Sequence, residues 1–309
     1  MKIDIITGFL GAGKTTFIAK YAKYLQNKKE KILVIENELS IAGVDGFELK
    51  EENLQIAEIS GGCACCTQVP KLIECINYAY EDGYDRIIFE PTGIYNVDSF
   101  FGILNYPSLT AKFDIGAIIT IVKPDFMIHD ESLNNILLSQ FLSTGAVVFS
   151  NTQSYSTEEI SQSIYELNNF TSSKNEFFDI SKISIFTKVW DDFTSEDFEE
   201  LSAVGRTECE HRQVYENHAL ILQSMFFLGR LKEASDIEKL TKELFEIEDM
   251  GILRIKGYFS DKEKNIYFIN NTNNCSLMKE STNKHTLVAV IGTNIDDGKI
   301  KAVVDKYKL

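Results

Sequence analysis

A glycine-rich segment near the amino terminus has the residue types and spacing of a phosphate-binding loop. Residues 8–15 read Gly-Phe-Leu-Gly-Ala-Gly-Lys-Thr, which fits the pattern GxxxxGK[ST]. In such a loop, glycines let backbone N–H groups converge on phosphate oxygens, the lysine reaches the β- and γ-phosphates, and the hydroxyl ligates Mg²⁺. The pattern predicts a nucleoside triphosphate site. Its predicted contact residues are Gly8, Gly11, Ala12, Gly13, Lys14, Thr15 and Thr16.

A second candidate segment follows the apolar run Arg86–Phe89 and reads Glu90-Pro91-Thr92-Gly93. An acidic residue at a strand end can complete the Mg²⁺ shell or order the attacking water, and a glycine N–H can sense the γ-phosphate. We therefore expect Lys14, Thr15, Glu90 and Gly93 to form the catalytic group, with Thr15 and Glu90 as Mg²⁺ ligands. The sequence contains no evident arginine finger or water-positioning glutamine, so we expect slow intrinsic turnover.

Three cysteines lie within four residues in the segment Gly61-Gly62-Cys63-Ala64-Cys65-Cys66. Thiolates at this density favour Zn²⁺, Cu⁺ or Co²⁺. Neighbouring cysteines are poorly placed to pair with one another, which argues against a disulfide. Two or three sulfurs leave an exchangeable position on a four-coordinate ion, which suits metal carriage. The alternative is that the cysteines are small buried side chains, and we favour that alternative for the isolated Cys75, Cys209 and Cys275.

The composition is that of a globular protein long enough for two domains. The chain has 309 residues, of which 44% are hydrophobic and 25% charged. Its formal net charge of −15 is opposite to that of a protein that tracks nucleic-acid phosphates, so we expect no nucleic-acid partner. The sequence shows no secretory signal and no apolar run of membrane-spanning length. We therefore expect a cytoplasmic protein with reduced cysteines and no membrane partner.

Short apolar runs alternate with helical patterns through the first half of the chain. The predicted strands are 3–6, 31–35, 54–59, 86–89, 116–122 and 145–149, and the predicted helices are 14–26, 70–80 and 195–201. Continuous Val/Ile runs indicate strands that are covered on both faces. This pattern predicts an α/β fold with a doubly wound, mostly parallel sheet in a nucleotide-binding domain at 1–205.

The last hundred residues have a different pattern. They contain predicted strands at 219–227, 251–259, 265–269 and 286–291, with helices at 235–247 and 297–306. Ser235 is a candidate N-cap for the first of these helices. We expect a small α+β domain at 212–309.

Taken together, these motifs resemble those of the CobW-like GTPases, which are related to the metallocentre-assembly proteins HypB and UreG. The resemblance rests on GFLGAGKTT, on Glu36-Asn37-Glu38, on GGCACC and on EPTG, which occur in the family's order. The segment Leu253–Phe259 also resembles a strand of the family's C-terminal domain. The resemblance implies GTP, Mg²⁺ and Zn²⁺ or Co²⁺ as cofactors, a client metalloprotein as partner, and Cys63, Cys65, Cys66 and Glu38 as transition-metal ligands.

One motif departs from the family. Its guanine-binding sequence NKxD or SKxD is replaced here by Ser150-Asn151-Thr152-Gln153. Gln153 stands where an aspartate would accept two hydrogen bonds from guanine, and a neutral amide cannot make that charge-assisted pair. We expect Ser150, Asn151 and Gln153 to line the base site, with GTP as the favoured nucleotide and ATP as the alternative.

The leading hypothesis is a P-loop nucleoside triphosphatase that couples hydrolysis to metal delivery. An alternative is a nucleotide-switched activator or docking module of a metal- or corrinoid-dependent enzyme, without metal transport. A small-molecule kinase is a third hypothesis, although the sequence shows no evident lid or acceptor site. A homodimer is left open.

Overall fold

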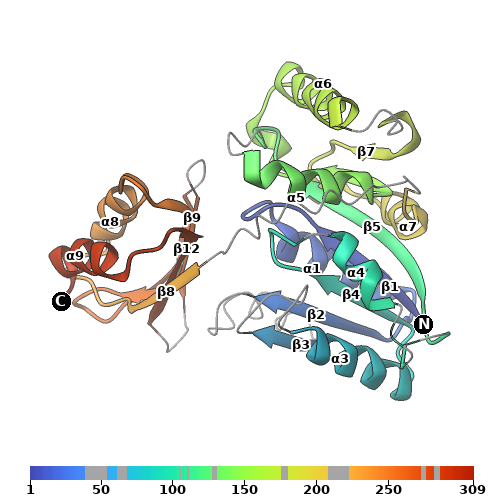
Figure 1. Ribbon diagram of the computed structural model, residues 1–309, viewed down its shortest axis with the longest axis horizontal. Helices are drawn as coiled ribbons and strands as arrows, with labels where there is room; N and C mark the ends of the chain where they lie inside the picture. Colours follow the sequence, from blue (N-terminus) through green and yellow to red (C-terminus); the bar gives the residue numbers. More distant parts are fainter. Residues whose placement is uncertain are drawn as a thin grey trace. The chain divides into compact units, whose positions relative to one another are not determined.

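The computed structural model describes residues 1–38, 54–60, 68–95, 97–104, 106, 108–109, 111–126, 131–174, 180–207, 223–272, 276–281 and 286–309. The chain divides into two compact units, Met1–Asn217 and His218–Leu309 (Figure 1). The sequence-based boundaries at 205 and 212 stay a prediction, because residues 208–222 lie outside the described ranges. Among the helices of the described residues, none is long and apolar enough to span a membrane.

The first unit is built on a seven-stranded sheet with the order β3-β2-β4-β1-β5-β6-β7. All its strand pairs are parallel. The strands are β1 (Lys2–Thr7), β2 (Ile32–Glu38), β3 (Gln55–Ser60), β4 (Arg86–Glu90), β5 (Asp114–Val122), β6 (Ala146–Phe149) and β7 (Ser184–Phe186). The predicted parallel α/β fold is confirmed.

Helices cover both faces of this sheet. Successive strand residues point to opposite faces, and both faces carry apolar side chains that the helices bury. Helices α1 (Lys14–Asn27) and α7 (Ser195–Ala203) pack on the face that carries Ile6, Val34 and Ile88. The other face is covered by α3 (Val69–Glu81), α4 (Val97–Leu104), α5 (Glu131–Leu142) and α6 (Thr157–Lys174). The predicted α1, α3 and α7 are confirmed, whereas α4, α5, α6 and β7 were not predicted.

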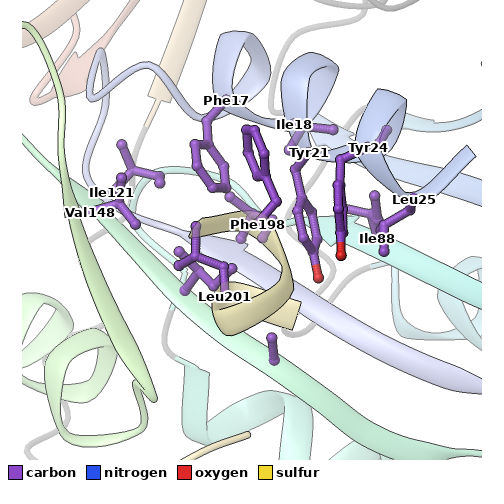
Figure 2. Close-up of a cluster of buried hydrophobic side chains, with 14 of the residues drawn as sticks. Phe17, Ile18, Tyr21, Tyr24, Leu25, Ile88, Ile121, Val148, Phe198 and Leu201 are labelled. Carbon is purple, nitrogen blue, oxygen red and sulfur yellow. The ribbon is translucent and has the colours of Figure 1, made fainter. Parts of the chain in front are cut away.

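Aromatic side chains join α1 to α7 (Figure 2). Phe198 of α7 stacks on Tyr24 of α1, with ring centroids 5.5 Å apart. Phe17 and Tyr21 continue this row along α1 at 6.0 Å from each other. Helix α7 begins with a reciprocal capping box between Thr194 and Asp197. The helix that follows the phosphate loop is therefore held against the sheet by a short helix from the far end of the unit.

A buried carboxylate ties three strands and α1 together. Asp4 of β1 is fully buried and forms an ion pair of 2.7 Å with Arg86 at the start of β4. It also accepts hydrogen bonds from the Tyr21 hydroxyl (2.8 Å) and from the backbone N–H of Ala117 (2.8 Å). The β1–β5 register shifts at this point, so the Ala117 N–H is turned toward the carboxylate.

The second unit is a five-stranded sheet with the order β11-β10-β9-β12-β8 and antiparallel pairs. Its strands are β8 (Gln223–Leu228), β9 (Gly251–Ser260), β10 (Ile266–Asn271), β11 (Met278–Ser281) and β12 (Leu287–Thr293). Helices α8 (Asp236–Phe245) and α9 (Asp297–Tyr307) share one apolar core with it, which confirms the predicted α+β character. Ser235 occupies the N-cap of α8, as predicted, and its side chain makes no capping hydrogen bond there.

The Asp4 network predicts a large cost for removing its cation. In an Arg86→Met variant, Asp4 stays buried without its counter-ion, and we expect the free energy of unfolding in urea to fall by about 3 kcal/mol at pH 8. The exposed pair between Lys28 and Glu199 provides the control, because Glu199→Gln should change stability by less than about 1 kcal/mol.

The loss of stability in the Arg86→Met variant should depend on pH. Burial raises the pKa of Asp4, and Arg86 opposes that rise. Without Arg86, the folded state binds a proton more tightly than the unfolded chain, so this group contributes most stability at low pH and loses it as pH rises. The difference in unfolding free energy between the Arg86→Met variant and the parent protein should therefore become smaller as the pH is lowered from 8 to 5. A gap that stays constant over this range would contradict the assignment.

Candidate nucleotide site

The predicted phosphate loop connects the end of β1 at Thr7 to the start of α1 at Lys14. Its three glycines have φ values of 136° at Gly8, 76° at Gly11 and 98° at Gly13, a region that glycine adopts without strain. A Cβ atom on Gly8 would lie 2.2 Å from the Ile121 carbonyl oxygen, so no larger residue fits there. The loop conformation therefore requires the glycines of the motif.

Lys14 is buried and folded over its own loop. Its Nζ donates hydrogen bonds to the carbonyl oxygens of Gly8 (3.1 Å) and Phe9 (3.4 Å). These contacts hold a fixed cation beside the helix N-terminus, where the backbone N–H groups of the first turn of α1 also favour an anion. The loop has the positive character that a polyphosphate requires.

The two predicted Mg²⁺ ligands meet although they lie 75 residues apart in the sequence. The Thr15 hydroxyl donates to both carboxylate oxygens of Glu90, at 3.0 and 3.2 Å. Glu90 is the last residue of β4, and β4 pairs directly with β1. A hydroxyl and a carboxylate in contact supply hard oxygen ligands of the kind that Mg²⁺ prefers, so the residues present fit that ion.

Gly93 lies directly on the phosphate loop. A Cβ atom placed on Gly93 would be 2.5 Å from the backbone nitrogen of Leu10. The turn that contains it is closed by a hydrogen bond of 2.9 Å from the Tyr95 N–H to the Thr92 carbonyl oxygen. The structure thus brings together Lys14, Thr15, Glu90 and Gly93, which were predicted to act together.

The predicted base segment follows β6 on the other side of the loop. Ser150 is buried, and its N–H donates to the Val122 carbonyl oxygen at 2.8 Å. Asn151 and Gln153 are exposed, and Asn151 has a left-handed backbone conformation that begins a short 3₁₀ turn, Thr152–Ser154. Ser150 also lies near Gly13, since its Cβ is 3.9 Å from a Cβ built on that glycine.

Trp190 is a site residue that the sequence reasoning missed. Its ring lies 3.1 Å from a Cβ built on Gly13 and packs edge-on against Phe17 of α1, with ring centroids 5.5 Å apart. Its indole N–H donates to the Phe149 carbonyl oxygen at 2.9 Å, directly before Ser150. The available signal was the single tryptophan of the sequence, four residues after a β-strand that was itself not predicted.

The residue after Trp190 is held on the outer side of α1. Asp191 forms an ion pair of 2.6 Å with Lys20, and the hydrogen bond from Lys20 lowers the pKa of the Asp191 carboxyl group. This pair anchors the Trp190 segment to the helix that follows the phosphate loop.

The predicted transition-metal ligands Cys63, Cys65 and Cys66 lie outside the described residues, as does the side chain of Glu38. Within the part of the chain that the structure describes, no group of three or more His, Cys, Asp or Glu side chains is arranged to hold a metal ion. Strands β2 and β3 pair in parallel, and the last pair in their register is Glu38 with Ser60.

Sequence comparison agrees with this geometry. The model of the family "CobW/HypB/UreG, nucleotide-binding domain" matches residues 2–178, which include the phosphate loop, the Glu90–Gly93 segment and the base segment. The chain belongs to the CobW/HypB/UreG family. The predicted resemblance is confirmed, and the first unit carries the family's nucleotide-binding domain.

Relatives of this CobW/HypB/UreG domain are similar over part of their length. The zinc chaperone YeiR of Escherichia coli (strain K12) is 29% identical over 164 residues, which are 53% of this chain and 50% of YeiR. The zinc chaperone CobW of Sinorhizobium sp is 31% identical over 126 residues, 38% of this chain and 35% of that protein. The chain thus spans half or less of the length of these relatives.

Solved structures of related proteins align with this chain at low TM-scores. Zn(II)-bound YjiA GTPase from E. coli aligns over 100% of this chain and 99% of its own, with 17% identity and a TM-score of 0.39. HypB from Helicobacter pylori in complex with nickel aligns over 65% of this chain and 83% of its own, with 16% identity and a TM-score of 0.40.

Trp190 gives a direct optical test of the site. Because its ring lies 3.1 Å from a Cβ built on Gly13, a nucleotide bound on the CobW/HypB/UreG loop should change the intrinsic tryptophan emission, measured by titrating GDP or GTP with Mg²⁺. A Lys14→Ala variant is the control and should show little change. A clear nucleotide affinity by calorimetry without any change in emission would contradict this placement of Trp190.

Proposed function

We propose that this protein is a nucleotide-dependent metallochaperone. It binds GTP with Mg²⁺ on the Gly8–Thr15 loop, hydrolyses it slowly, and couples hydrolysis to delivery of Zn²⁺ or Co²⁺ from the Cys63–Cys66 segment to a client metalloprotein. The observation that carries the proposal is the contact of the Glu90–Gly93 segment with the phosphate loop, through Thr15 and Leu10.

Each described residue of the site has a role that its geometry supports. Lys14 and the loop N–H groups would neutralise and orient the β- and γ-phosphates. The Thr15 hydroxyl and the Glu90 carboxylate would hold Mg²⁺, which would supply further positive charge to the transferring phosphoryl group. Gly93 lies against Leu10, so its N–H is near enough to the loop to respond to the γ-phosphate.

Strand pairing supports coupling between this site and the cysteines. Glu36 of β2 is the register partner of Glu90, and Glu38 is the register partner of Ser60 at the end of β3. Cys63 follows Ser60 by three residues, a chain length of at most about 11 Å. Strands β3, β2 and β4 run parallel, so β3 ends at Ser60 on the same edge of the sheet at which Glu90 contacts Thr15. A movement of the Glu90–Gly93 segment on hydrolysis could change the affinity for the metal through this edge.

The names of the relatives support zinc as the metal. YeiR and CobW are both called zinc chaperones. The activator hypothesis also has support, because a relative from Dictyostelium discoideum, 32% identical over 110 residues, is called a zinc-regulated GTPase metalloprotein activator. Both readings require a client protein, and they differ in whether the metal leaves the cysteines.

The metal site gives the first test of the proposal. Zn²⁺ titration of reduced protein should give an affinity at least ten-fold different between the GDP-bound state and the state with a non-hydrolysable GTP analogue, because coupling requires differential binding. Cys65→Ser should abolish tight binding in both states, whereas Cys75→Ser should not. Equal Zn²⁺ affinities in the two nucleotide states would exclude the coupled delivery.

The base segment gives a second test. In a Gln153→Asp variant, the new carboxylate can accept the two guanine N–H groups, so the preference for GTP over ATP should rise about ten-fold. Competition binding with the two nucleotides measures this ratio. The exposed Ser154→Asp is the matched control and should leave the ratio unchanged. If Gln153→Asp also leaves it unchanged, this segment does not contact the base.

A further inference from the structure

Gln140 of α5 reaches the turn that carries Gly93. Its side chain is fully buried, and its Nε2 donates to the carbonyl oxygens of Gly93 (3.3 Å) and Tyr95 (3.4 Å). Both acceptors are carbonyl oxygens, which only the NH₂ end of the amide can satisfy, so the orientation of the amide is determined. A single buried side chain thus holds two peptide groups of the Thr92–Tyr95 turn.

Gln140 is itself anchored to the sheet. Its backbone carbonyl oxygen accepts a hydrogen bond of 3.1 Å from the Thr120 hydroxyl of β5. Thr120 is the register partner of Thr7, the residue directly before the phosphate loop. The neighbouring Ser139 hydroxyl accepts from the Val97 N–H at the start of α4 (3.3 Å). Two consecutive residues of α5 therefore hold Gly93, Tyr95 and Val97 at a fixed place relative to the loop.

We propose that Gln140 is a positioning residue of the nucleotide switch, which keeps the Gly93 turn against the phosphate loop so that its N–H meets the γ-phosphate. This role rests on the proposed nucleotide-dependent function. Gly93 is constrained from two sides, by Leu10 on its Cα and by Gln140 on its carbonyl oxygen. Removing the amide would free the peptide group on the carboxyl side of Gly93 while the phosphate loop stays intact.

The proposal predicts a selective defect. A Gln140→Met variant keeps the side-chain volume and loses both hydrogen bonds. GDP should bind with unchanged affinity, because the hydrogen bonds of Gln140 go to Gly93, Tyr95 and Thr120 rather than to the phosphate loop. The ratio of GTP-analogue to GDP affinity and the kcat of hydrolysis should each fall about ten-fold, the effect of two modest hydrogen bonds.

Two further variants separate positioning from stability. Thr171→Val on α6 removes a buried hydroxyl that bonds within its own helix at 2.8 Å, and it should lower the melting temperature without changing kcat. Gln140→Glu keeps the shape. Its ionised carboxylate would repel the two carbonyl oxygens, while its protonated form can donate to one of them. Its kcat relative to the parent should therefore rise as pH is lowered from 8 to 6.

Hydrogen exchange of residues 92–97, measured without nucleotide, tests whether Gln140 holds the Gly93 turn. Faster exchange there in Gln140→Met than in Thr171→Val, together with the lower affinity ratio, would support the proposal. Normal exchange and a normal affinity ratio would overturn it. If the parent protein binds no nucleotide, the proposed function fails, and exchange in this segment still decides whether Gln140 holds the turn.

Discussion

The parallel pairing of β1 with β4 is the constraint on which the site depends. Parallel strands end at the same edge of a sheet, so the loop after Thr7 and the carboxylate of Glu90 emerge side by side. The hydrogen bonds from Thr15 to Glu90 follow from this register. A slip of β4 by one residue would turn Glu90 to the opposite face of the sheet and separate the Thr15 hydroxyl from the carboxylate.

The same central strands explain why a fully buried ion pair is present. Asp4 lies three residues before Thr7 at the end of β1, and Arg86 is the first residue of β4, so the ion pair lies away from the carboxyl ends of the strands, where the phosphate loop begins. Tyr21 brings α1 into this network, and Phe198 presses on the same helix from α7. The orientation of α1, and with it the direction of its N-terminus toward an anion, is therefore set by contacts well away from the site. The network joins β1 to β4 through Arg86 and to α1 through Tyr21, so it constrains both the pairing of the two strands and the orientation of the helix.

Residues whose role is local could be predicted from the sequence, and residues whose role depends on tertiary contact could not. The loop glycines need positive φ angles, and the spacing of Gly8, Gly13 and Lys14 already implies that need. The central strands were equally accessible, because buried parallel strands are continuous apolar runs. Helix α5 was missed because Ser132, Asn134 and Asn135 break up the apolar pattern in its first half, and α4 and α6 were also not predicted. Gln140 and Trp190 carry no motif at all. Their importance comes from carbonyl oxygens and a glycine that lie far from them in sequence, and a single sequence does not show such contacts.

The position of α5 bears on how the two halves of the site communicate. Helix α5 holds the turn at Gly93 through Gln140. The short connection Ser143–Gly145 then joins α5 to β6, which leads to the predicted base segment at Ser150. Thr144 fixes that connection by donating to the Ile118 carbonyl oxygen of β5. A rigid helix that is connected to both the base segment and the turn at Gly93 can transmit a displacement from one to the other. This requires that the helix can pack in two alternative positions. Under the proposed function, α5 would link the base segment to the turn at Gly93. Weaker contacts at Gln153 would then leave more of the nucleotide's binding energy to the phosphate end, where Gln140 holds Gly93. We therefore propose that the protein responds more strongly to the presence of the γ-phosphate than to the identity of the base.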